Sequence, residues 1–201
     1  SFRASNKELL SAEYAFVVLR NPFKRLLSFY CDKLCNEGED PNDTSYDTAK
    51  SMMGTTAKTT FAEFIDTLWQ RPTLKKRNGH TQDQCDFLIY NNYHDYFSVE
   101  RYKDTASTIF KKTGVTLEDT RPFNSIYTTY SCEESINLNH ETPAELIGSA
   151  IKKSQKPIVK NMYTPDLIKK VGSLYLSDIL LYLRVIKNSE EEMQYWLSHM
   201  A

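Results

Sequence analysis

The chain has 201 residues, of which 40% are hydrophobic, and its formal net charge is −1. This length suits one domain with a sizeable core, and the nearly neutral charge gives no electrostatic case for binding DNA, RNA or a membrane surface. No apolar stretch is long enough to span a bilayer, no signal-peptide pattern opens the chain, and the four cysteines lack the spacing of a zinc site, although a Cys85–Cys132 disulfide stays open.

The first predicted elements are a strand and a helix within residues 15–30. Five apolar residues run without a break up to Arg20, which favours a strand buried on both faces, as in a parallel sheet. Asn21 can cap the following helix, and the proline after it suits the first helical position. Arg20 therefore ends the strand, and Ser28 lies on the flank of the helix. Open α/β sheets bind ligands at this edge, and a guanidinium with a hydroxyl suits a phosphate.

Residues 16–34, FVVLRNPFKRLLSFYCDKL, resemble the 3′-phosphate-binding strand and helix of the carbohydrate sulfotransferases, meaning the Golgi-type sulfotransferase family 2 and its bacterial relatives. These enzymes use 3′-phosphoadenosine-5′-phosphosulfate (PAPS) as sulfate donor. An Arg and a Ser in their R-x-P-…-R-L-x-S pattern hold the 3′-phosphate, and the matching positions are Arg20 and Ser28. The alternative is an Arg that is only solvated, but a whole run matches. The resemblance implies an α/β fold with a P-loop-NTPase-like central parallel sheet flanked by helices and a helix-rich C-terminal part.

The second donor-binding element of this family is a loop with a Lys and a Ser or Thr that holds the 5′-phosphosulfate. Such loops surround an anion with backbone N–H groups, and nothing before Phe16 looks like one. We therefore expect residues 1–201 to form a single sulfotransferase-like domain whose 5′-phosphosulfate loop precedes Ser1 in the full protein. If the full protein has no such loop, the alternative is a non-catalytic module that binds a nucleotide or a glycan.

Residues 36–58 are polar and acidic and predict a long exposed loop. We interpret it as a solvated insertion in preference to a lid over the substrate. Its acids lack the alternating ligands of a calcium loop. Thr60 and Glu63 then form a capping box, and apolar residues at helical spacing predict an amphipathic helix through Trp69 that packs on the core.

A basic cluster follows and ends at Arg77, before an Asn-Gly turn signal. The next residues, 80–88 (HTQDQCDFL), resemble the H-x-x-x-Q-x-x-x-L element near the active site and acceptor channel of the same family. A neutral His80 could accept the proton of the acceptor hydroxyl, and the alternative is a loop histidine that bonds the backbone. Gln84 either orients the loop or binds the acceptor. A basic cluster is usually a solvated face, but its position before His80 makes Arg77 a candidate for acceptor binding.

Residues 93–102, YHDYFSVERY, resemble the Y-D-x-I-G-x-F-E strand of the family, with Ser98 in the place of the Gly. Alternation along this segment supports a strand. Glu100 at its end is a candidate for substrate binding, with pairing to a nearby basic group as the alternative. Asn124 weakly matches an Asn that lies close to the donor in the family, so it joins the candidates for donor binding.

The rest of the chain predicts helices. Residues 103–113 form a predicted helix with Ile109 and Phe110 turned inward, ended by Gly114. Three capped helices are predicted to finish the chain, beginning at Thr142, Thr164 and Ser189. Asp178 lies in a segment that resembles the Y-x-x-D-x element of the family, and we expect it to be structural and tied to a core Arg.

The resemblance implies an enzyme that moves a sulfuryl group from PAPS to a hydroxyl of a carbohydrate or another hydroxyl-bearing acceptor, with no metal and no nucleic-acid partner. In this family the location would be cytoplasmic for a bacterial chain and the Golgi lumen for a eukaryotic one. The non-catalytic binding module is the second hypothesis. A nucleotide kinase ranks third, because the sequence has no Walker-type Gly-Lys-Ser/Thr.

Overall fold

The computed structural model describes residues 11–36, 45–88, 93–117, 135–153 and 155–200. These residues form an α/β structure that is mostly helical and contains short parallel strands. The strands are β1 (Phe16–Leu19), β2 (Asp95–Ser98), β3 (Ser135–Ile136) and β4 (Lys156–Pro157). The α-helices are α2 (Pro22–Phe29), α3 (Ser45–Met53), α4 (Phe61–Gln70), α5 (Tyr102–Thr113), α6 (Ala144–Lys152), α7 (Pro165–Leu174), α8 (Leu176–Val185) and α9 (Ser189–Met200).

Shorter helical segments connect these elements. One is a π-helix, η1 (Tyr30–Leu34), which continues α2 without a break. The others are the 3₁₀-helices η2 (Pro72–Arg77), η3 (Gln84–Phe87), η4 (Val99–Arg101) and η5 (Val159–Met162). None of the described helices is long and apolar enough to cross a membrane.

The strands β1 and β2 are parallel and in register, with Phe16 opposite Asp95 and Leu19 opposite Ser98. The predicted parallel arrangement is therefore confirmed, but within the described residues this sheet has two strands and is not the broad central sheet expected. The prediction that β1 is buried on both faces is wrong, since Val18 is 42% exposed. With β2 as its one paired neighbour in the described part of the chain, the middle of β1 stays open to solvent.

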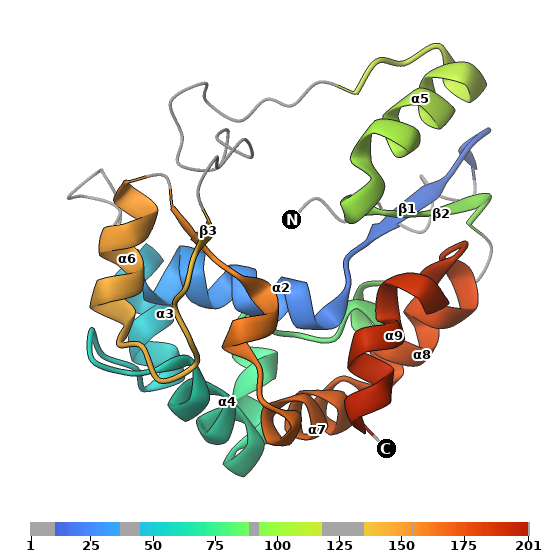
Figure 1. Cartoon of the computed structure of the whole chain (residues 1–201). Coiled ribbons are helices and arrows are strands. Elements are labelled where there is room, and N and C mark those ends of the chain that lie inside the picture. Colours follow the sequence, from blue (N-terminus) through green and yellow to red (C-terminus); the bar gives the residue numbers. More distant parts are fainter. Residues whose placement is uncertain (1–10, 37–44, 89–92, 118–134, 154, 201) are drawn as a thin grey trace.

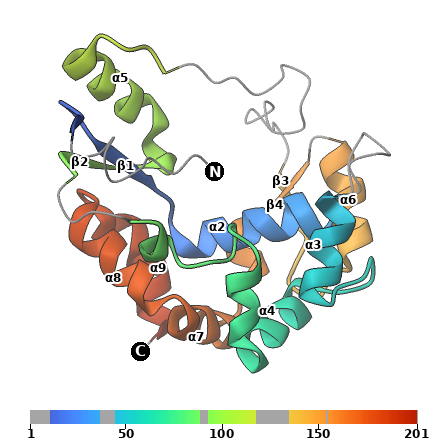
Figure 2. The same cartoon turned by 180° about the vertical axis from the view of Figure 1, so that it is seen from behind.

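The helix α2 runs from the end of β1 through the middle of the helical part toward α3 and α6, as Figure 1 and Figure 2 show. Asn21 caps it as predicted, because its Oδ1 accepts hydrogen bonds from the backbone N–H groups of the next turn. One face of the helix is buried in the core. Phe23 stacks on Trp196 of α9 with ring centroids 4.5 Å apart, and Tyr163 contacts both rings edge to face.

The helix α2 and its continuation η1 form one rod, and the far end of the rod, at η1, packs closely against α6. Gly148 of α6 lies so near the backbone of Cys35 that a Cβ at position 148 would be 2.0 Å from the Cys35 carbonyl oxygen. No other residue fits there without a shift of the backbone. Tyr30 ties the same region to the turn before α4, because its hydroxyl donates to the Thr59 carbonyl at 2.7 Å.

Several local predictions are confirmed. The Thr60–Glu63 capping box is present at the start of α4, and Thr164 caps α7. Gly114 ends α5 with a φ of +70°, in the left-handed region that favours glycine. Beyond α7, the C-terminal part is helical as expected, with α8 and α9 packed on each other.

Four further expectations are wrong. Thr142 does not cap α6, which begins at Ala144 with Pro143 as its N-cap and has no side-chain cap hydrogen bond. Part of the predicted exposed loop 36–58 is the helix α3, which buries Ala49 and Met53. Two aromatic or apolar side chains expected on inner faces point outward, since Trp69 is 45% and Phe110 53% exposed. The two buried residues of α3 are four positions apart and therefore lie on one face of the helix. Their apolar contact stabilises a helix within an otherwise polar sequence. Residues 118–134, with the candidate Asn124 and Cys132, lie outside the described residues.

Candidate functional site

The tips of β1 and β2 bring two predicted site residues together. Arg20 directly follows β1 and Glu100 lies two residues beyond β2, so the parallel register places both at one edge. The Arg20 Nε lies 3.7 Å from the Glu100 Oε1, a loose ion pair. Both atoms are buried and neither has a hydrogen-bond partner among the described residues. Because buried polar atoms are normally satisfied, the Arg20 guanidinium has unused donor capacity at this edge.

Glu100 is held in place through its other carboxylate oxygen. Ser98 donates to the Glu100 Oε2 at 2.7 Å, and the Tyr182 hydroxyl of α8 lies 2.7 Å from the Ser98 Oγ. The Tyr182 hydroxyl also donates to Glu192 of α9 at 2.9 Å. Burial, with the nearby Glu100 and Glu192 carboxylates, raises the pKa of Tyr182 well above its usual value, so it stays a donor. These contacts agree with the second interpretation of Glu100, in which its carboxylate pairs with a nearby basic group.

Gln84 clamps the backbone of Arg20. The Arg20 N–H donates to the Gln84 Oε1 at 2.8 Å, and the Gln84 Nε2 donates back to the Arg20 carbonyl at 2.9 Å. The side-chain amide thus makes the two backbone hydrogen bonds that a neighbouring strand would otherwise make. It holds in place the backbone from which the Arg20 side chain extends. Of its two predicted roles, this contact favours the orienting one, and acceptor binding by Gln84 stays a prediction.

Asp178 of α8 fixes the start of η3. Its buried carboxylate accepts from the Arg25 Nη2 at 2.8 Å and from the backbone N–H groups of Gln84 and Cys85 at 2.9 and 3.0 Å. The expectation that Asp178 is tied to a core Arg is confirmed. Cys85 is a free thiol that donates to Asp178 at 2.9 Å, and burial together with this carboxylate raises its pKa to about 12. The thiol is therefore protonated near neutral pH and unreactive.

Residues 80–84 lie beside α2 and run antiparallel to it. His80 stacks on Phe29 at the end of the helix, with ring centroids 6.1 Å apart and an interplanar angle of 23°. Halfway along, the Arg25 Nη1 donates to the Gln82 carbonyl at 2.7 Å. The segment ends at the start of the helix, where its last residue clamps the end of β1. The two sequence motifs, which are about 60 residues apart in the chain, therefore form one continuous surface.

His80 is exposed on this surface, and its ring makes no hydrogen bond to any described residue. Desolvation against the neighbouring protein and the positive charge of Lys33 lower its pKa below the ordinary value of 6.5. The imidazole is therefore neutral near pH 7 and can accept a proton. Ser28 is half-buried one residue before Phe29, and its hydroxyl likewise has no hydrogen-bond partner in the described part of the chain.

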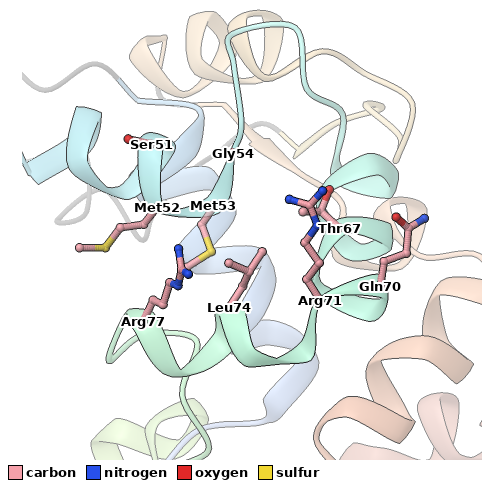
Figure 3. Close-up of a pocket in the computed structure, with 9 residues that line it drawn as sticks. All are labelled: Ser51, Met52, Met53, Gly54, Thr67, Gln70, Arg71, Leu74 and Arg77. Carbon is pink, nitrogen blue, oxygen red and sulfur yellow. The ribbon is translucent and has the colours of Figure 1, made fainter.

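Arg77 lies elsewhere, on the wall of a pocket of about 310 Å³ formed by α3, α4 and η2 (Figure 3). The pocket is lined by Ser51, Met52, Met53, Gly54, Thr67, Gln70, Arg71, Leu74 and Arg77. The residues of the basic cluster thus point to different places, and Arg77 is one of those that line the pocket. Lys75 turns away to the Asp83 carboxylate, 2.8 Å from its Nζ, and is structural.

Sequence reasoning missed part of the strand-tip network. Ser98 was visible as a departure from the Gly of the family pattern, and its hydroxyl links Glu100 to Tyr182. Tyr182 gave no signal, because it looks like any buried aromatic residue of a helix. The described residues contain no cluster of His, Cys, Asp or Glu able to hold a metal ion.

A comparison with known protein families gave a match. The family model described as "Sulfotransferase family" matches residues 2–183, which is most of the chain and includes both the strand-tip segment and residues 80–88. Searches among curated proteins and among solved structures gave no match.

Proposed function

Since the chain belongs to the sulfotransferase family, we propose that it transfers a sulfuryl group from PAPS to a hydroxyl of a carbohydrate, on a P-loop-like fold. The observation that carries the proposal is the edge at which β1 ends. There Arg20 has unused donor capacity and its backbone is clamped by Gln84.

Arg20 and Ser28 are proposed to hold the 3′-phosphate of the donor. Guanidinium groups suit phosphate oxygens because they donate two parallel charge-assisted hydrogen bonds. Glu100 would orient the guanidinium, and its own second oxygen is already occupied by Ser98. The Ser28 hydroxyl, which has no partner among the described residues, would complete the set. Asn124 remains a donor-binding candidate outside the described residues.

His80 is proposed as the general base. When bound, PAPS supplies an activated sulfuryl group, whose bond to the 5′-phosphate breaks as the acceptor oxygen bonds to sulfur. The His80 imidazole would take the proton from that oxygen, and its lowered pKa keeps it neutral and ready to do so. Its stacking on Phe29 limits the motion of the ring.

Nucleotide binding to Arg20→Ala tests the donor site. The affinity for adenosine 3′,5′-bisphosphate should fall about 10-fold or more, the loss expected for hydrogen bonds to a charged group, whereas adenosine 5′-phosphate should bind nearly as before. Isothermal titration calorimetry measures both. Lys111→Ala, which removes an exposed charge from α5, is the matched control and should change neither. An equal loss for the two nucleotides would show that Arg20 does not bind the 3′-phosphate.

A second candidate function is a non-catalytic module that binds a nucleotide or glycan. The clamped Arg20 at the end of β1 would bind a nucleotide in either case, so binding alone does not separate the module from the enzyme. Transfer of labelled sulfate from PAPS by the full protein, assayed on a panel of glycans, separates the two. Nucleotide binding without transfer to any glycan would support the module.

A further inference from the structure

The ion pair between Arg20 and Glu100 is open, although both side chains are largely removed from water. A carboxylate beside a guanidinium commonly forms two parallel hydrogen bonds, which requires both carboxylate oxygens. Here the Glu100 Oε1 lies 3.7 Å from the Arg20 Nε, and neither atom has a hydrogen-bond partner among the described residues. The two opposite charges are adjacent, so another contact has to keep them from closing into a two-bond pair.

The second carboxylate oxygen of Glu100, Oε2, is held by two hydroxyl groups, those of Ser98 and Tyr182, which we call the hydroxyl pair. Ser98 donates to this oxygen at 2.7 Å, and its Oγ lies 2.7 Å from the Tyr182 hydroxyl. The direct contact from the Tyr182 hydroxyl to the same oxygen is longer, at 3.4 Å. Ser98 and Tyr182 are both buried, so water competes little with these hydrogen bonds.

The hydroxyl pair is anchored on the C-terminal helices. Tyr182 belongs to α8, and its hydroxyl donates to Glu192 of α9 at 2.9 Å. The Glu192 carboxylate in turn lies 3.6 Å from the Lys24 Nζ of α2. Because α8 and α9 pack on each other, the place of the Glu100 Oε2 is set by two packed helices as well as by β2.

The short link in this arrangement is particular to this chain. Ser98 stands where the sulfotransferase pattern has a Gly, and a glycine has no hydroxyl to donate. With a glycine there, the Glu100 Oε2 would keep only the two contacts of 3.4 Å, from the Asn21 N–H and from the Tyr182 hydroxyl. Both are at the weak end of the hydrogen-bond range and would restrain the carboxylate less.

We propose that Ser98 and Tyr182 are positioning residues that hold Glu100 so that it orients Arg20 without neutralising it. With Oε2 held, the carboxylate offers one oxygen to the Arg20 Nε, and the terminal nitrogens of the guanidinium stay available for a phosphate. Without the hydroxyl pair, the carboxylate would be free to turn and close on the guanidinium, in competition with the ligand. This inference rests on the proposed function, in which Arg20 binds the 3′-phosphate, and it adds how the fold keeps this arginine available.

The preference for a 3′-phosphate tests the proposal. The measured quantity is the affinity for adenosine 3′,5′-bisphosphate divided by that for adenosine 5′-phosphate, both from isothermal titration calorimetry. Ser98→Ala and Tyr182→Phe should each lower this ratio about 3–10-fold, the size of one hydrogen bond, with the larger loss in Ser98→Ala. Tyr30→Phe is the matched control, because it removes a buried tyrosine hydroxyl that donates to the Thr59 carbonyl at 2.7 Å. Its ratio should stay within about twofold, and an equal loss there would overturn the proposal.

A rescue variant separates positioning from a general loss of packing. In Ser98→Ala combined with Glu100→Gln, the amide oxygen can still accept from the Arg20 Nε but has no charge to neutralise the guanidinium. The ratio should therefore return to within about threefold of the unaltered chain. A ratio that stays as low as in Ser98→Ala alone would show that the hydroxyl does not act by restraining the Glu100 charge, and the proposal would fail.

The NMR signal of the Arg20 Nε–H, assigned with Arg20→Lys, tests the positioning without any nucleotide. In Ser98→Ala and Tyr182→Phe this signal should shift and its exchange with water should slow, because a closed ion pair protects the proton. An unchanged signal in both variants would contradict the proposal. A changed signal beside an unchanged nucleotide preference would support the positioning role and place the failure in the proposed 3′-phosphate site.

Discussion

The strand-tip region, made of Arg20, Arg25, Gln84, Glu100 and Asp178, differs from the pocket formed by α3, α4 and η2 in how its charges are balanced. At the strand tips, Arg25 is paired with Asp178, and Arg20 lies beside Glu100 with its backbone clamped by Gln84. In the pocket, Arg71 and the arginine at the end of η2 have no acidic partner among the described residues. The first region has its charges balanced within the chain, and the second has positive charge that no described residue balances.

This contrast has a measurable consequence. Removing a side chain at the strand tips should affect both folding and function, because the same hydrogen bonds serve both. Removing a pocket arginine should leave the free energy of unfolding nearly unchanged.

His80→Ala should lower turnover by about 10²–10⁴-fold, the usual contribution of a general base, with little change in the affinity for adenosine 3′,5′-bisphosphate. In the unaltered chain, turnover should rise with pH as the imidazole loses its proton and level off above its pKa, which lies below 6.5. The variant should lack this rise. Steady-state rates between pH 5 and 8 would check both points, and wild-type turnover in the variant would remove His80 from the base role.

Asp178→Ala should lower the free energy of unfolding by about 3–5 kcal/mol, because it leaves the Arg25 charge and two backbone N–H groups without their acceptor. Urea denaturation measures the change. The control is Asp66→Ala, since Asp66 is half-exposed and pairs with Lys170 at the surface, where a loss below about 1 kcal/mol is expected. Similar losses in the two variants would mean that the strand-tip region is not specially organised.

Gln84→Ala should destabilise the fold by about 1–3 kcal/mol, because the backbone N–H and carbonyl of Arg20 lose their partners. Binding of adenosine 3′,5′-bisphosphate should weaken in parallel. Gln84→Glu is the sharper variant, since a carboxylate still accepts from the Arg20 N–H but cannot donate to the carbonyl. Its affinity for the nucleotide should fall between those of the alanine variant and the unaltered chain, and an affinity unchanged in both variants would contradict the clamping role.

Arg77→Ala should change the free energy of unfolding by less than about 0.5 kcal/mol, as is usual for an exposed side chain with no ion pair. Urea denaturation beside the Asp178 series is the measurement. A loss above 1 kcal/mol would show that Arg77 has a structural contact, and the contrast between the two regions would then fail.

Local signals made the strand-tip segment predictable. The Asn21 cap and the apolar run before Arg20 are properties of adjacent residues, and they gave the strand, the turn and the helix in their observed order. A motif resemblance predicted that Asp178 would be tied to a core Arg, and the structure identifies that residue as Arg25, 153 positions away in the chain.

The features that escaped prediction depend on contacts between distant segments. The exposure of Val18 follows from how many strands pair with β1, which no local pattern reveals. The helix α3 is stabilised by two buried residues whose contact surface lies elsewhere in the chain. The pocket likewise needs α3, α4 and η2 in their final places. The Arg-Leu-Arg spacing of η2 was present in the sequence, but its meaning depended on a 3₁₀-helix in place of an α-helix.

The close contact at Gly148 has a consequence for the whole rod formed by α2 and η1. One end of this rod follows directly on Arg20, whose backbone is clamped by Gln84, and the other lies where α6 touches the backbone of Cys35. A helix restrained at both ends resists tilting and sliding. If the proposed donor binds along this rod, discrimination between nucleotides would be set by the side chains that the rod presents. A methyl group added at position 148 would then loosen that selectivity from the opposite end of the helix.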